Sequence, residues 1–273
     1  MSVFSERVTR AIVPLVLTLA IGACAGDEDS ERFVERPVQD IYNEALDALR
    51  DEDYVVAAQR FDDVERQHPY SVWAVKASLM AAFAHYQATN YDEAIPALDR
   101  FIQLHPGNAD IAYAYYLRAL CFYEQISDVV RDQLNTERAE AALNEVVRRF
   151  PDTPYARDAR LKIDLTRDHL AGKEMNIGRY YLRLGHYLAA IQRFRRVVRT
   201  YDTTSHIPEA LHRLTEAYFA LGLTEEATKT AAVLGHNYPG SPWYADSYAL
   251  VGGGVAPNPD ERGFFRRAFD WVF

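Results

Sequence analysis

The chain is poor in the residues that most catalytic and metal sites need. It has two cysteines among 273 residues, Cys24 and Cys121, so it contains neither a disulfide framework nor a CxxC pair. Its eight histidines are scattered without metal-ligand spacing, and no HExxH or GxSxG motif occurs. We therefore predict no catalytic residue, no metal site, no cofactor and no enzymatic activity. The net charge of −9 argues against nucleic acid as a partner.

The chain also lacks a continuous apolar run of about 20 residues, the length that a membrane-spanning helix needs. Its N-terminal apolar segment, residues 11–21, is shorter and follows two positive charges, Arg7 and Arg10. This order of a positive start and a short apolar core is typical of a targeting signal. We therefore expect residues 1–23 to be a signal peptide that lies outside the fold.

The end of this segment carries a second signal. It reads Ile21-Gly22-Ala23-Cys24, which resembles the bacterial lipoprotein motif and implies that Cys24 is the lipidated N-terminus. Residues 24–37 are polar and charged, as expected of a tether between lipid and fold. Ala25 stands where an aspartate would indicate retention in the inner membrane, which favours the outer membrane. The alternative is an ordinary secretory signal with an incidental cysteine.

What the chain has in abundance is one repeated helical pattern. Residues 90–106 read NYDEAIPALDRFIQLHP, with apolar residues at helical spacing and a proline that cannot continue the helix. When the other copies of this pattern are aligned on it, five residues fall at the position of Pro106, where the helix has ended. We call these the stop positions: Pro69, Pro106, Pro151, Asp202 and Pro239. Their spacing exceeds the roughly 34-residue tetratricopeptide period only by insertions. The sequence therefore predicts an all-α tetratricopeptide-repeat α-solenoid of about five helical hairpins, rather than five unrelated amphipathic helices.

These repeats divide the chain. Residues 38–152 are predicted to hold repeats one to three, interrupted at 125–133 by an insertion placed to leave the solenoid. Repeat insertions often bind partners, but a tolerated loop extension is an equal alternative. Residues 153–250 are predicted to hold an added helix and repeats four and five, with Gly172 as a candidate break in that helix. Residues 251–273 are a Gly/Pro linker and an aromatic tail.

The back half carries two groups of candidate partner contacts. Arg193 and Arg196 lie on the second helix of repeat four, and are interpreted either as a solvated face or as contacts to an acidic partner. The tail contributes four aromatic candidates: Phe264, Phe269, Trp271 and Phe273. As a helix the tail would fit a partner groove or a membrane surface, whereas its alternating end also has the pattern of an edge strand.

Three stretches carry a resemblance to a known family: residues 68–86, 105–133 and 149–181. Together with the lipoprotein signal, the five repeats and the insertion, they resemble the BamD family of the outer-membrane β-barrel assembly machinery. The resemblance covers roughly residues 20–250, and the tail after Val251 departs from the family's pattern. It implies a non-catalytic adaptor, anchored by lipid at the periplasmic face of the outer membrane.

The resemblance also implies partners. The C-terminal repeats would dock on the periplasmic domains of the barrel-forming subunit, with accessory assembly lipoproteins as further partners. The N-terminal repeats would help to recognise and insert unfolded outer-membrane protein precursors. The competing hypothesis is a lipidated repeat scaffold that positions peptidoglycan or envelope-division enzymes, because its fold and anchor would be the same.

Within this family reading, the concave face of repeats one to three is the expected substrate site. First helices line the concave face in this architecture, and the candidate contacts are Tyr42, Trp73, Lys76, Phe83 and Tyr86. The end of the tail, residues 269–273, resembles the terminal signal of a barrel protein, which typically ends in an aromatic residue. The tail is therefore a candidate to occupy the substrate groove in cis, or to mimic substrate toward the barrel-forming subunit.

Overall fold

The computed structural model describes residues 36–252, which form eleven α-helices and no strand within that range. The helices are α2 (Val38–Arg50), α3 (Tyr54–Gln67), α4 (Val72–Gln87), α5 (Tyr91–Leu104), α6 (Ile111–Tyr123), α7 (Leu134–Arg149), α8 (Pro154–Arg183), α9 (Tyr187–Thr200), α10 (Ile207–Ala220), α11 (Thr224–Asn237) and α12 (Pro242–Gly252). None of these helices is long and apolar enough to cross a membrane.

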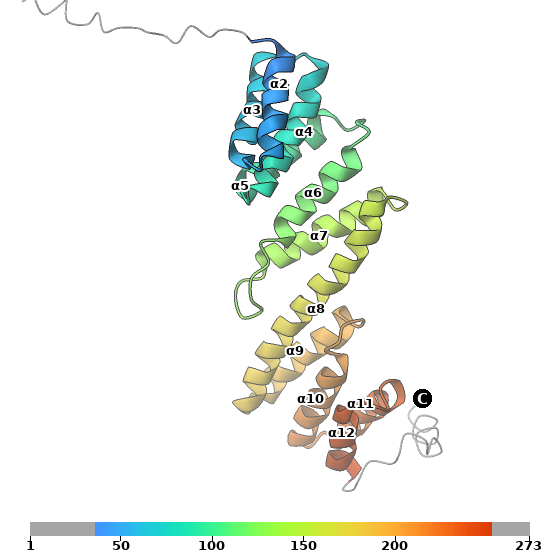
Figure 1. Cartoon of the computed structure of the whole chain (residues 1–273). Helices are drawn as coiled ribbons and strands as arrows, with labels where there is room; N and C mark the ends of the chain where they lie inside the picture. The colour runs from blue at the N-terminus through green and yellow to red at the C-terminus, as the bar shows by residue number, and fades with distance from the viewer. Residues whose placement is uncertain (1–35, 253–273) are drawn as a thin grey trace, which may run out of the picture.

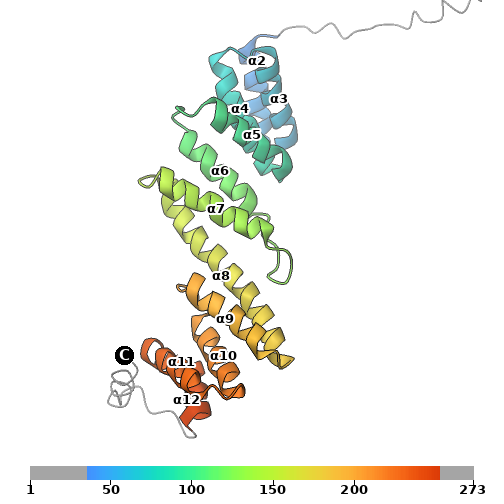
Figure 2. The same cartoon turned by 180° about the vertical axis from the view of Figure 1, so that it is seen from behind.

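Each helix packs mainly against its neighbours along the chain, so the molecule is an elongated stack of antiparallel hairpins (Figures 1 and 2). The core is distributed in the same way, as four clusters that follow one another from α2 to α12. Such a solenoid gains its stability from contacts between adjacent repeats rather than from one central core. The predicted all-α solenoid of tetratricopeptide type is confirmed.

The repeat phase is visible in the helix ends. The five stop positions predicted from the sequence all lie two residues beyond a helix end, after α3, α5, α7, α9 and α11. Each of these helices ends with a residue whose N–H bonds to the carbonyl four residues back, as His68 does to Val64. On the same five helices the small residue of the pattern is fully buried: Ala57, Ala94, Ala139, Ala190 and Ala227. Its small size lets two helices of neighbouring hairpins approach closely.

Helix α8 joins the two halves of the stack. It runs without interruption over 30 residues, so the prediction of a break at Gly172 is wrong. Gly172 is buried, and a Cβ there would lie 3.2 Å from Nε2 of His206 and 3.5 Å from Cγ1 of Val129. The absence of a side chain therefore serves close approach by other segments rather than a kink. The first half of α8 packs on α6 and α7, and its second half packs on α9.

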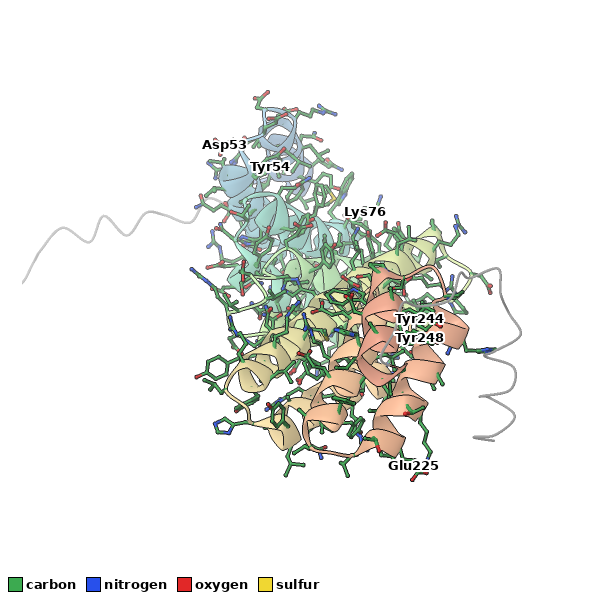
Figure 3. All side chains as sticks on the ribbon, turned by 90° about the horizontal axis from the view of Figure 1, so that it is seen from below. Asp53, Tyr54, Lys76, Glu225, Tyr244 and Tyr248 are labelled. Carbon is green, nitrogen blue, oxygen red and sulfur yellow. The ribbon has the colours of Figure 1, made fainter. Side chains whose placement is uncertain are left out.

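Helix α12 closes the described end of the stack against α10 and α11. Tyr244 and Ser247 are its buried residues, and Tyr248 lies one turn after Tyr244 with the ring centroids 6.2 Å apart (Figure 3). The hydroxyl of Ser247 is 2.8 Å from Nδ1 of His212, which fixes α12 to α10. Burial lowers the pKa of His212, so the bond joins two neutral groups at neutral pH.

Candidate interaction surfaces

The aromatic residues predicted on the first two hairpins do not all face outward. Tyr42 is only 8 % exposed, and its ring lies 4.8 Å from that of Trp73 and 5.4 Å from that of Phe61. These distances are those of packed aromatic pairs, which stabilise the contact between α2, α3 and α4. Tyr42 is therefore a core residue of the first hairpin, with little ring surface left for a ligand.

The remaining candidates lie on α4. Trp73, Lys76 and Phe83 share one face of this helix at helical spacing, and Lys76 is exposed (Figure 3). Tyr86 packs against Tyr91 at 5.9 Å, and burial, followed by the negative charge of Glu124, raises the pKa of Tyr86 to about 12. Its hydroxyl is therefore a neutral hydrogen-bonding group at any physiological pH. Of the five predicted contacts, Lys76 is the one that is exposed, while Trp73, Phe83 and Tyr86 are half-buried.

A second aromatic group extends this surface, and sequence reasoning missed it. Tyr155 of α8 lies 5.5 Å from Tyr113 and 5.3 Å from Tyr116, both on α6. The hydroxyl of Tyr116 donates to the carboxylate of Asp158, which holds the pKa of that carboxyl below its usual value. Only the tyrosine-rich run of α6 was visible in the sequence, because the pairing with α8 depends on how the hairpins stack.

The insertion between α6 and α7 folds back onto α8 instead of projecting from the solenoid. The carbonyl of Ser127 is 2.8 Å from Nε2 of His169, and Nζ of Lys173 donates to the carbonyls of Val130 and Arg131 at 2.8 and 3.0 Å. The prediction that this segment leaves the solenoid is therefore wrong. The sequence could not have shown this, because nothing in residues 125–133 indicates that α8 supplies the side chains that bind their carbonyl groups.

The folded insertion lines one side of an open pocket of about 670 Å³ between α8 and the start of α10. Its wall combines apolar side chains, such as Val129 and Leu165, with polar ones. Asp168 accepts hydrogen bonds from the backbone and hydroxyl of Ser205 and lies 3.7 Å from Nε2 of His206. Within residues 36–252 no group of three His, Cys, Asp or Glu side chains could hold a metal ion. The pocket is large enough to accommodate side chains of a partner.

The predicted arginines of α9 bind an internal carboxylate. Arg193 and Arg196 each lie 3.1 Å from one oxygen of Glu174, whose side chain is 9 % exposed. Both guanidinium groups remain partly exposed on their outer side. Sequence reasoning missed Glu174, because its place opposite α9 depends on the packing of α8 on α9.

The end of α8 and the start of α9 expose apolar side chains on the same pair of helices as these arginines. Tyr180, Leu184 and Leu188 follow one another at intervals of four residues, and each is at least half exposed. Large apolar residues exposed on both sides of one turn make this turn a candidate contact surface. We call these three residues the α8–α9 patch.

Several predicted site residues lie outside the described part of the chain. These are the lipidation candidate Cys24 and the tail residues Phe264, Phe269, Trp271 and Phe273. The other cysteine, Cys121, is fully buried in the core of α4 to α6, and burial raises the pKa of its thiol to about 12. It is an inert core residue.

Comparison with known proteins defines the class. The model of the family "YfiO: Outer membrane lipoprotein" matches residues 34–234, which include almost the whole described solenoid, and the chain belongs to this family. It is 48% identical, over 99% of its own length and 90% of the relative's, to the outer membrane protein assembly factor BamD of Caulobacter vibrioides. It is also 48% identical to BamD of Rickettsia prowazekii, over 87% of this chain and 94% of that protein. Among solved structures, the TPR domain of P58(IPK) matches 78% of this chain and 55% of that chain, with 16% identity and a TM-score of 0.41.

Proposed function

We propose that this protein is a non-catalytic assembly factor for outer membrane proteins, held by lipid at the periplasmic face of the outer membrane. The observation that carries the proposal is the extent of the likeness to the BamD proteins, which spans both halves of the solenoid and the N-terminal segment. A generic repeat protein would share only the small and aromatic positions that any such hairpin needs. Identity at about half of all positions is more than the buried core positions alone can supply.

The anchor in this proposal is Cys24. Its acylation would add two or more chains, and each buried methylene contributes about 0.8 kcal/mol, so the attachment would be effectively permanent. Residues 24–37 would then link the lipid to α2. This arrangement keeps the solenoid in the periplasm, close to the membrane in which barrels are inserted.

The proposed dock for the barrel-forming subunit is the α8–α9 patch with Arg193 and Arg196. The patch supplies exposed apolar area, and the outer N–H groups of the arginines are free to bind an acidic partner even while Glu174 holds their inner side. Because α8 is continuous and packs on both halves of the stack, a partner bound here is rigidly connected to the front half. Accessory assembly lipoproteins are proposed as further partners.

Unfolded precursors are proposed to bind along the front half. Trp73, Lys76 and Phe83 on one face of α4 offer aromatic area and a cation, which suits an extended segment that ends in an aromatic residue and a carboxylate. Tyr113, Tyr116 and Tyr155 would extend the contact toward the central pocket. The alternative, a scaffold for peptidoglycan or envelope-division enzymes, is not favoured, because the relatives are assembly factors.

The deciding experiment is a pull-down of the tagged, lipidated protein from detergent-solubilised envelopes, identified by mass spectrometry. Near-stoichiometric recovery of a barrel-forming subunit with periplasmic domains is expected. The variant Leu184→Asp/Leu188→Asp should lose this subunit, whereas the control Leu223→Asp, also exposed but in the turn between α10 and α11, should retain it. Recovery of peptidoglycan enzymes in place of the barrel-forming subunit would overturn the proposal.

A further inference from the structure

The first described residue of the chain is fixed to the turn between α3 and α4. The N–H of Arg36 donates to Oε1 of Gln67 at 3.4 Å, and the carbonyl of Arg36 is 2.7 Å from Nε2 of His68. The guanidinium of Arg36 also pairs with Glu44 of α2. The point at which the N-terminal segment reaches the solenoid is therefore defined by three contacts, and it lies beside the start of α4.

The same end of the solenoid presents large apolar residues to solvent. Tyr70, in the turn between α3 and α4, is fully exposed, and Val72, the first residue of α4, is 81 % exposed. Since α5 runs antiparallel to α4, its last residue, Leu104, comes to the same end of the hairpins, and it is also exposed (Figure 1). We call Tyr70, Val72 and Leu104 the tether-side edge.

The length of chain between the lipid and this edge decides what lies opposite it. From Cys24 to Arg36 a fully extended segment reaches at most about 40 Å, at about 3.4 Å per residue. An acylated Cys24 would thus confine the tether-side edge to a thin layer next to the bilayer, where even weak contacts with lipid are favoured by the high effective concentration.

The chemistry of the edge suits a lipid surface. Tyrosine is enriched at membrane interfaces, because its ring is apolar and its hydroxyl can remain among the headgroups. Val72 and Leu104 add exposed apolar area to that of Tyr70. The three contacts that these side chains would make with lipid are weak. They would orient an anchored protein without adding much to the strength of the anchor.

We propose that the tether-side edge rests on the lipid surface into which Cys24 is anchored. This contact would set the angle of the solenoid, with the ends of α3 and α5 and the start of α4 against the headgroups and the opposite turns directed into the periplasm. The inference rests on the proposed lipid anchor and adds an orientation to it. The proposed occupant is lipid, not a second protein.

The test uses the full-length lipidated protein in vesicles of phosphatidylethanolamine and phosphatidylglycerol. A polarity-sensitive fluorophore is attached at Tyr70→Cys or Leu104→Cys, and at Val55→Cys as the matched control. Val55 is half exposed at the start of α3, about 20 Å along that helix from the tether-side turn. Native Cys121 is fully buried, so the introduced thiol is the accessible one within the described structure.

Vesicles that carry a nitroxide near the headgroups should quench both edge probes at least about two-fold, since interfacial groups sit only about 5–10 Å deep. The Val55→Cys probe should be unaffected. Flotation with the vesicles and mass spectrometry of the N-terminus report the anchor separately. A protein that is lipidated and floats but shows no quenching at Tyr70→Cys overturns the orientation and leaves the anchor intact. An unlipidated protein that does not float overturns both.

A protein occupant would give a different result. In that case the edge probes would be unquenched in vesicles that contain the protein alone. They would become shielded from iodide in the water only after a barrel-forming subunit or an unfolded barrel precursor is added. This outcome would assign the tether-side edge to a partner and overturn the lipid contact.

Discussion

Replacing Gly178 by alanine is expected to destabilise the solenoid at the crossing of α8 and α9. A Cβ at this position would lie 2.5 Å from Cε1, 2.8 Å from Cζ and 2.9 Å from Cδ1 of Phe194. Phe194 is fully buried in the core of the back half, so its ring has no free space to move into. Gly178→Ala must therefore push α9 away from α8 or force the ring out of its rotamer.

The magnitude follows from two opposing terms. Alanine is a better helix former than glycine and would contribute about 1 kcal/mol within α8. Overpacking of a filled core costs about 1–3 kcal/mol, and contacts this short with three atoms of one ring lie at the upper end or above it. We expect a net loss of about 2 kcal/mol. The sign of the change in unfolding free energy is the important part, because helix propensity alone predicts that Gly178→Ala stabilises the protein.

Urea unfolding of the unlipidated chain, followed by circular dichroism, measures this loss. The matched control is Gly172→Ala in the same helix, where the nearest atom is the edge of the His206 ring at 3.2 Å and a small shift suffices. Gly172→Ala should be neutral or slightly stabilising. In the double variant Gly178→Ala/Phe194→Leu the two changes should compensate in part, as neighbouring residues do in a double-mutant cycle. A Gly178→Ala protein as stable as the wild type would refute the reasoning.

Three further outcomes are expected. His212 has a pKa below its ordinary 6.5 because of burial, so its contribution to stability is present above pH 6.5 and falls as the pH drops below it; His212→Gln should flatten this part of a Tm-against-pH curve. Arg193→Ala/Arg196→Ala should lower the free energy of unfolding by about 1–3 kcal/mol, because Glu174 is left nearly buried without these two partners. Adding Glu174→Gln should restore most of that stability, and restored stability without restored binding in the pull-down would separate the structural role of the arginines from docking. Cys24→Ser should move the protein from the membrane fraction to the soluble periplasm, and a protein that stays with the membrane would contradict the proposed anchor.

Much of the architecture was predictable because it follows from the local spacing of apolar residues along the chain. The five stop positions and the small residues such as Ala94 follow from the rules for a single helical hairpin, and the same rules apply five times. The family resemblance extended this to a function, through stretches too specific for a generic repeat. An added helix after the third repeat was also predicted, although its uninterrupted course through Gly172 was not.

For the individual site residues, the sequence predicted the chemistry of the side chain but not what surrounds it. Tyr42 has the right chemistry for a ligand contact, but its ring fills the space between Phe61 and Trp73. Arg193 and Arg196 looked like a free basic face, but the partner carboxylate of Glu174 comes from another helix. In each case the sequence names a group and the packing of a distant segment decides what that group faces.

The sequence by itself determined the helices, their order, the repeat phase and the family, because each depends on residues close together in the chain or on likeness along it. Only the tertiary structure decided that the insertion folds onto His169 and Lys173, and that Gly178 rather than Gly172 marks the tightest crossing. It alone brought Arg36 to the turn that carries Tyr70. The physical reason is that a solenoid buries its surface between helices and hairpins, so the contacts that define its faces join residues from 16 positions apart, as Gly178 and Phe194 are, to 43 positions apart, as Lys173 and Val130 are.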